Sequence, residues 1–399
     1  MRHMAKLVTA IALSLALAQG VALENQAQGT INAALELWTL PAADNGLTGI
    51  VYDDVDGAVF YAAFNRDRIG RLTPATGDLT EWPVGDGPVD LALGGAGPLL
   101  ILQPATIYVT ESLDNRIALL EPITNGYHAE PVLTPGGFPN GIDFYASITR
   151  PGEAWFSERN SNRVGRVQGL QNHLSPVIPT QQRLAPTTRM VSVRQTLLSP
   201  TLRRGNPMLA PAVMLAPHVR LGNVEEWDIS GFYQGPSFPE SVAVNVDGKV
   251  WIANSAQSVL LLLDPDSDVM EFHGLPAGSR AVDVKLDLMG NVWYTTGYSH
   301  RIGRLDPASG DVMEWTLPTA GQPLNLAVGE NSVWFTEREG DRLGWFDPTS
   351  GELLSFQLPV GTHPLDLAAV APNEVWFTSE RQDVLGHLTV TALGAPPAP

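Results

Sequence analysis

Three glutamates end similar aromatic runs and are the first residues whose type and spacing could do chemistry. Glu111 ends TIYVTE, Glu158 ends EAWFSE and Glu337 ends VWFTE. A carboxylate at the end of an apolar strand can act as a general base or as an oxygen ligand of a divalent cation. We consider Glu158 and Glu337 as candidate catalytic residues, with His363 as the best-placed imidazole, and Glu111 as a candidate ligand-binding residue.

A second position, two residues after the start of another apolar run, carries aspartates. Asp90, Asp283, Asn325 and Asp366 occupy this position in four copies of the run. Carboxylate and amide oxygens are the ligands that Mg²⁺ or Ca²⁺ prefers, so these four residues are candidate metal ligands. An alternative is that each aspartate accepts hydrogen bonds from backbone N–H groups and ties neighbouring units together, since buried polar groups normally have partners.

These runs belong to a repeat. An element resembling IGR recurs at Ile69, Ile117, Val164, Val259, Ile302, Leu343 and Leu385. A period of about 40 to 50 residues made of short strands indicates a β-propeller, with one four-stranded blade per repeat. The spacing predicts an all-β fold, a seven-bladed β-propeller over residues 30–390. Eight blades are the alternative, because residues 164 and 259 are separated by about two periods.

The two ends of the repeat are complementary. The segment 35–41, LELWTLP, matches 312–318, VMEWTLP, and stands before the first full unit, whereas the last unit lacks its fourth strand. We expect the N-terminal strand to pair with the last unit and close the ring, because closure leaves no open sheet edge. Residues 391–399 are expected to form a flexible tail.

A proline-rich insertion interrupts the third unit at about residues 170–222. Residues 186–222 contain no Trp, Tyr or Phe, and the segment lacks the Asp-Gly turn of the other units. We interpret it as an irregular excursion from the edge of blade three.

The N-terminus and the composition predict export. Residues 1–22 combine Arg2 and Lys6 with an apolar stretch and small residues, the pattern of a signal peptide. The chain has no cysteine, which excludes thiol chemistry, and its net charge of −18 disfavours nucleic acid. No other stretch is long enough to insert into a membrane. We expect a secreted or periplasmic monomer that binds a small molecule, glycan or protein.

Four short motifs follow one another within the repeat: P-x-G-I, VWFTE, NRIGR and EW-x-LP. Together they resemble the virginiamycin B (streptogramin B) lyase family over roughly residues 35–390. The resemblance implies a propeller enzyme that opens a cyclic depsipeptide by elimination. It further implies a magnesium ion, a catalytic histidine near the start of a first strand, and a glutamate at the end of a WFTE strand.

The position expected for that histidine holds no histidine in any unit. Asn140 in FPNGIDF is the nearest match, and Glu240 occupies the same position in the next unit. Asparagine cannot take up a proton at neutral pH. We therefore consider Asn140 and Glu240, together with His300 in a recurring turn position, as candidate ligand-binding residues.

These patterns favour an exported binding or scaffold protein with its ligand at the mouth of the central tunnel. The alternative is a metal-dependent C–O lyase that opens a cyclic depsipeptide or lactone by elimination, using Mg²⁺ or Ca²⁺. A propeller-type lactone hydrolase with a divalent cation is a third possibility.

Overall fold

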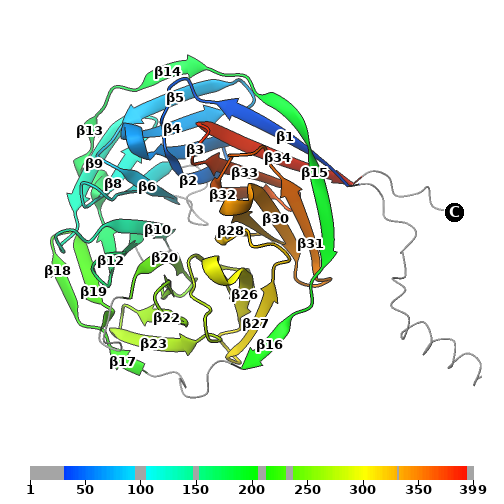
Figure 1. Cartoon of the computed structure of the whole chain (residues 1–399). Coiled ribbons are helices and arrows are strands. Elements are labelled where there is room, and N and C mark those ends of the chain that lie inside the picture. Colours follow the sequence, from blue (N-terminus) through cyan, green and yellow to red (C-terminus); the bar gives the residue numbers. More distant parts are fainter. Residues whose placement is uncertain are drawn as a thin grey trace, which may run out of the picture.

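The computed structural model describes residues 31–94, 105–146, 152–204, 213–230, 237–329 and 332–392. It is an all-β structure whose sheets stand around a central axis as the blades of a β-propeller (Figure 1). The predicted signal peptide lies outside the described residues. The described part contains no helix long and apolar enough to cross a membrane.

The repeating unit is an antiparallel four-stranded array, and each array is named here by its innermost strand. The β2 array contains β2 (Leu47–Asp53), β3 (Ala58–Ala63), β4 (Arg68–Thr73) and β5 (Asp78–Pro83). The β6 array contains β6 (Pro88–Gly94), β7 (Thr106–Glu111), β8 (Arg116–Glu121) and β9 (Gly126–Pro131). The β10 array contains β10 (Pro139–Tyr145), β11 (Glu153–Glu158), β12 (Arg163–Gln168) and β19 (Val224–Asp228).

The remaining arrays follow the same pattern. The β20 array contains β20 (Pro239–Val244), β21 (Val250–Asn254), β22 (Val259–Asp264) and β23 (Val269–Gly274). The β24 array contains β24 (Val284–Leu286), β25 (Val292–Thr295), β26 (Arg301–Leu305) and β27 (Asp311–Thr316). The β28 array contains β28 (Pro323–Val328), β29 (Val333–Glu337), β30 (Arg342–Asp347) and β31 (Glu352–Gln357). The β32 array contains β32 (Pro364–Ala371), β33 (Glu374–Ser379), β34 (Val384–Ala392) and β1 (Ile31–Thr39).

Aromatic side chains of the second strands explain much of the repeated sequence. Trp155, Trp251 and Trp334 are buried and contribute to the apolar layers of the propeller. The glycine of the IGR element lies opposite another aromatic ring: a Cβ at Gly344 would lie 2.0 Å from Cζ of Phe335. Only glycine leaves room for that ring, so the repeated glycine is a packing requirement.

The pairing predicted between the chain's two ends is present. β1 pairs antiparallel with β34 along its whole length, from Ile31 opposite Ala392 to Thr39 opposite Val384. The N-terminal strand therefore supplies the fourth strand of the last array. Because β34 continues to Ala392, the first two residues of the expected tail belong to a strand, and residues 393–399 lie outside the described part.

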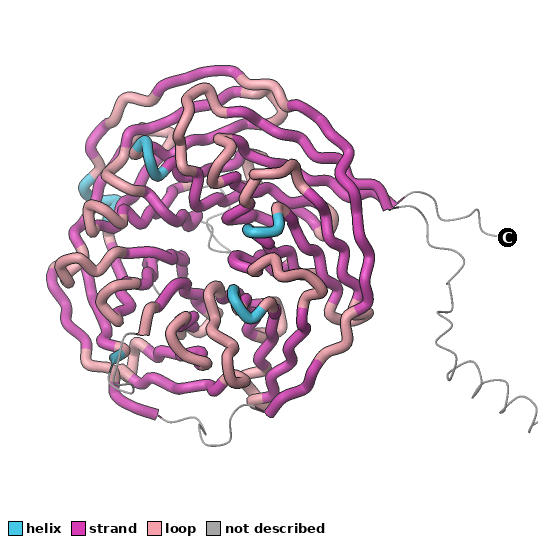
Figure 2. Tube along the Cα trace, in the orientation of Figure 1, coloured by secondary structure: helices cyan, strands magenta, loops and turns pink. Residues whose placement is uncertain are grey.

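The insertion departs from the irregular excursion expected for it, and that expectation was wrong. It lies between β12 and β19, and its described residues 174–204 and 213–222, here called the outer belt, form strands on the outer edges of the arrays (Figure 2). Backbone pairing explains the difference, because a propeller blade leaves one edge open on the outside and the belt pairs with it. The belt strands are β13 (Ser175–Pro176), β14 (Thr180–Arg183), β15 (Thr187–Leu197), β16 (Thr201–Arg204), β17 (Val213–Leu215) and β18 (His218–Leu221).

The belt visits the arrays in the reverse of chain order (Figure 1). β13 pairs with β9, β14 with β5, β16 with β27, β17 with β23 and β18 with β19. β15 is different because it pairs first with β1 and then with β31, and so joins two arrays into one nine-stranded sheet.

Short 3-10 turns complete the described structure. They lie at Phe64–Arg66, Leu170–His173, Gly297–Ser299 and Arg338–Gly340. Three of them join the second and third strands of an array, which is the turn that carries His300 and its counterparts.

Candidate functional site

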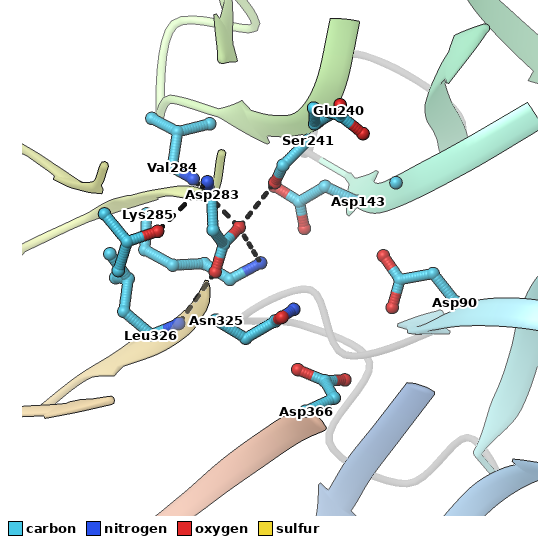
Figure 3. A network of polar contacts seen from close by, with 12 residues as sticks. Asp90, Asp143, Glu240, Ser241, Asp283, Val284, Lys285, Asn325, Leu326 and Asp366 are labelled. Carbon is cyan, nitrogen blue, oxygen red and sulfur yellow. Dashed lines mark hydrogen bonds and ion pairs between the residues drawn. The ribbon is translucent and has the colours of Figure 1, made fainter. Parts of the chain in front are cut away.

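A cavity of about 550 Å³ lies where the innermost strands of the arrays converge. Its lining includes residues from β2, β6, β10, β20, β28 and β32, together with Asp283 and Lys285 of the β24 array. Polar side chains from several arrays approach one another there (Figure 3).

A β-bulge in the first strand turns the side chain at the recurring aspartate position toward this cavity. The pairing of the first strand shifts register between Pro88 and Leu91, and again between Pro364 and Leu367. Such a bulge removes the intervening residues from the regular ladder and re-aims their side chains. Asp90 and Asp366 lie inside these two bulges and line the cavity.

The aspartates tie adjacent arrays together through backbone hydrogen bonds. Asp90 accepts the N–H of Leu91 at 2.8 Å and that of Ile142, in the next array, at 2.9 Å. Asp366 accepts the N–H of Ile50 at 2.9 Å. These contacts match the alternative interpretation of the recurring aspartates.

Asp283 is the most heavily bonded of the predicted metal ligands. It accepts the hydroxyl of Ser241 at 2.6 Å and the N–H groups of Val284 and Leu326, both at 2.8 Å. It is buried, and its partners belong to the arrays on both sides of its own. Asn325, the fourth predicted ligand, lines the same cavity.

Glycine fills the recurring position at Gly49 and Gly141, where neighbouring innermost strands lie close together. A Cβ on Gly141 would lie 2.7 Å from Cα of Ser241, so any side chain there would force the two arrays apart. The ring of polar groups is therefore interrupted for a packing reason.

Lys285, the cationic side chain of this site, was not predicted from the sequence. Nζ of Lys285 lies 3.7 Å from Oδ1 of Asp283, and Lys285 lines the cavity (Figure 3). Burial alone would lower the pKa of Lys285, but the charges of Asp283, Asp90, Asp143 and Asp366 raise it above the ordinary value. The side chain is therefore an ammonium ion. The Asp283-x-Lys285 spacing, which places both side chains on one strand face, was the available signal.

Asp143 was missed as well, because it lies two residues beyond the recurring position. It accepts the N–H groups of Phe144 and Val244, both at 2.8 Å, and so joins the β10 and β20 arrays. Burial raises its pKa, while Lys285 and both backbone donors oppose the rise. With Asp90, Asp283 and Asp366 it makes four carboxyl groups around one ammonium.

Because these carboxyl groups are buried close together, the pKa values of Asp90 and Asp366 are raised. Burial raises the pKa of Asp90 to about 6, and the charge of Asp283 adds to the rise, whereas Lys285 opposes it. Burial and the charge of Asp90 raise the pKa of Asp366 to about 8. At neutral pH Asp366 therefore holds a proton, whereas Asp90 is largely ionised.

This donor set fits a divalent cation poorly. Lys285 already supplies a positive charge at 3.7 Å from Asp283, and the aspartate oxygens accept backbone N–H groups. Within the described residues, no group of three or more His, Cys, Asp or Glu side chains has an arrangement that could hold a metal ion.

The predicted glutamates lie elsewhere. Glu111 is buried, accepts the N–H of Gly85 at 2.8 Å and forms an ion pair with Arg116 at 3.2 Å. Glu337 is also buried and pairs with Arg342 at 3.1 Å. Neither glutamate lines the cavity, so the structure does not bring these two together with the aspartates.

Glu158 has a different environment from the other two glutamates. Burial raises its pKa to about 8, and the neighbouring charge of Glu226 adds to the rise. Glu158 accepts the hydroxyl of Ser161 at 2.7 Å, while Glu226 accepts the hydroxyl of Thr134 at 2.7 Å. Two buried carboxyl groups meet here, and neither lines the cavity.

Two predicted ligand-binding residues, Asn140 and Glu240, line the cavity, whereas the two predicted histidines, His300 and His363, do not. Nδ2 of Asn140 donates to the carbonyl oxygen of Glu240 at 2.7 Å, and Glu240 forms an ion pair with Arg159 at 3.0 Å. His363 lies 3.0 Å from Nη1 of Arg381, away from the cavity lining. His300 ends a 3-10 turn in a left-handed conformation, and it too lies outside the lining.

Comparison with known proteins supports the predicted resemblance. Residues 223–394 match the Virginiamycin B lyase family. No curated protein matches the chain by sequence.

Solved structures share the fold of almost the whole chain. A streptogramin B lyase has 19% sequence identity and a TM-score of 0.67, over 90% of this chain and 98% of that one. A catalytically inactive histidine-to-alanine variant of virginiamycin B lyase from Staphylococcus aureus, solved with quinupristin, has 18% identity and a TM-score of 0.64, over 90% and 99%. YCF48 bound to D1 peptide has 12% identity and a TM-score of 0.50, over 91% and 97%. The chain therefore has the β-propeller fold of these proteins, and its residues 223–394 are similar to the virginiamycin B lyase family.

Proposed function

We propose that this chain is an exported binding protein, a seven-bladed propeller closed by β1, whose central cavity takes a small ligand bearing an ammonium group or several hydroxyl groups. The observation that carries the proposal is the convergence of four aspartates on one cavity whose lining contains a single ammonium, that of Lys285. Export rests on the N-terminal sequence pattern.

The size and charge of the cavity support this ligand class. A volume of about 550 Å³ lies inside the range of about 300–1,000 Å³ that is usual for small-molecule sites. Four aspartates and one lysine line the cavity, so it contains more acidic than basic side chains. A cationic or neutral hydroxylated ligand gains from these acceptors, whereas an anion meets repulsion.

The side chains at the lyase positions favour binding over elimination. In the S. aureus enzyme a histidine-to-alanine change accompanies loss of catalysis. The first-strand position at which the resemblance implies a catalytic histidine holds Asn140 in the nearest unit of this chain. The amide of Asn140 is committed to the carbonyl oxygen of Glu240. No histidine of the described residues lines the cavity, so the cavity lacks an imidazole base.

A divalent-metal-dependent C–O lyase is the second candidate. The family match and the raised pKa of Glu158 favour it, because a carboxylate with a pKa near 8 has the basicity that proton abstraction needs. Mg²⁺ or Ca²⁺ binding stays a prediction. Incubation with quinupristin and Mg²⁺, followed by mass spectrometry, tests this activity, and a ring-opened product would replace the binding proposal.

A ligand screen by isothermal calorimetry tests the proposed function. We expect amines or polyhydroxylated compounds to bind the mature chain and carboxylates of matched shape not to bind. The double variant Asp90→Asn/Asp366→Asn should weaken amine binding, whereas Asp311→Asn, an exposed aspartate on β27, should not. Equal binding by both variants would place the ligand outside the cavity and contradict the proposal.

A further inference from the structure

The outer belt differs from the rest of the chain in charge. Residues 174–222 contain six arginines and no aspartate or glutamate, although the whole chain has a net charge of −18. The belt is therefore a basic band on the rim of an acidic body.

The belt also gathers exposed apolar side chains. Eight of the 17 large apolar side chains that are exposed in the described residues belong to it. They are Ile178, Met190, Leu197, Leu202, Val213, Leu215, Val219 and Leu221. Contiguous exposed apolar surface marks interaction sites more often than isolated residues do.

One belt strand stands out as a template for pairing. β15 has 11 residues and no proline, whereas the other belt strands have only two to four residues. Native sheet edges are usually blunted by short strands and by proline, and β15 has neither protection. At about 3.3 Å per residue it presents about 36 Å of edge.

The outer edge of β15 has no partner strand among the described residues. Residues 187–191 pair with β1 and residues 192–197 pair with β31, so both halves use the same edge of the strand (Figure 1). The backbone N–H and C=O groups of the other edge remain free for a new strand. Only a polypeptide can pair such a row of groups in series, which excludes a lipid headgroup as the main occupant.

The exposed charges on β15 indicate which kind of polypeptide would bind there. Arg189 and Arg194 are exposed on β15, and neither has a carboxylate partner within the described residues. Met190 and Leu197 lie on the same strand, with 66% and 74% of their surface exposed. In the antiparallel register that pairs residues 187–196 with one another, a second copy of β15 would place Arg189 opposite Arg194. Charge therefore disfavours this self-pairing and favours an acidic strand that also carries apolar side chains.

We propose that the outer edge of β15 binds an extended acidic segment of a partner protein, which adds to the nine-stranded sheet as a further strand. The acidic body does not prevent this, because exposed charges beyond about 8 Å are largely screened at physiological ionic strength. The site lies on the rim, so it is separate from the central cavity and does not depend on the ligand proposed there.

The test uses the mature chain and a fluorescent ten-residue peptide of valine, threonine and glutamate, with two glutamates five residues apart so that one lies on each face, as Arg189 and Arg194 do on β15. Fluorescence anisotropy should show saturable binding, and Arg189→Glu/Arg194→Glu should weaken it about tenfold, since two exposed ion pairs become repulsive contacts. Arg183→Glu, on β14, is the matched control and should leave binding unchanged. Unaltered circular dichroism spectra of the variants would show that the fold is retained.

A second peptide separates strand addition from charge attraction alone. N-methylation of alternate residues removes the N–H donors without altering charge, and it should abolish binding. Equal binding of the methylated peptide, or equal loss with Arg183→Glu, would overturn the proposal. Binding of phosphatidylglycerol vesicles that depends on Arg189 and Arg194, without binding of the peptide, would overturn it in favour of a membrane surface.

Discussion

The innermost strands and the outer belt of this propeller carry opposite charges in opposite surroundings. The inner ring holds Asp90, Asp143, Asp283 and Asp366 around Lys285, and backbone donors fix its carboxylates. On the belt, Arg189 and Arg194 are exposed and have no carboxylate partner among the described residues, whereas Arg220 forms an ion pair with Glu225 at 2.7 Å. The inner charges therefore hold the arrays together, whereas Arg189 and Arg194 contribute little to folding and are free for a partner.

The largest expected effect comes from breaking an inner contact. Asp283→Ala leaves the hydroxyl of Ser241 and the N–H groups of Val284 and Leu326 without their acceptor. Since each unsatisfied buried donor costs about 1–3 kcal/mol, we expect the free energy of unfolding to fall by about 3 kcal/mol or more. Urea denaturation followed by tryptophan fluorescence measures this change, and a loss below 1 kcal/mol would show that the inner ring does not hold the arrays together.

Lys285→Met should have the next largest effect, because it leaves the four carboxyl groups without a cation. The lysine side chain is 40% exposed, so solvent screening limits the expected loss to about 1–2 kcal/mol. In this variant Ca²⁺ should raise the melting temperature more than it does in the native chain, because the ion would replace the ammonium. The same Ca²⁺ response in both proteins would contradict the role assigned to Lys285.

Protonation of Asp366 should give the inner ring a pH dependence. Its pKa is raised to about 8, so the folded state holds a proton that the unfolded state releases near pH 4. Stability should therefore fall as pH rises from about 4 to 8. Asp366→Asn should flatten this fall and raise the melting temperature at pH 8 by about 2–4 °C. An unchanged pH profile in calorimetric melts would refute the assignment.

The smallest expected change in the free energy of unfolding comes from a substitution on the outer belt. Arg194→Glu should change the free energy of unfolding by less than about 0.5 kcal/mol, because Arg194 is exposed and has no carboxylate partner among the described residues. Thermal melts at equal protein concentration measure this. A loss comparable to that of Asp283→Ala would remove the distinction between the two regions.

The sequence predicted what the repeat encodes and missed what only one copy carries. The recurring strands, the pairing of β1 with β34 and the aspartates of the first strands all follow from comparing copies. Lys285 and Asp143 each occur in a single copy, so the repeat contains no signal for them. Their effect depends on strands from several arrays meeting at one cavity, which spacing within one array does not determine.

The belt was missed for a related reason. Its strands are short, separated by prolines and paired with residues far away in sequence, such as Val193 with Phe356. Strand prediction from local alternation needs several residues in a row. The run from Thr187 to Leu197, which is rich in β-branched residues, was the one local indication of its strand structure.

Crystals soaked separately in caesium and bromide give the sharpest test of the proposed cation-favouring cavity. We expect an anomalous caesium peak in the cavity near Asp90, because the aspartates of the lining outnumber Lys285. A bromide peak beside Lys285 without a caesium peak would contradict it, since the cavity would then favour anions.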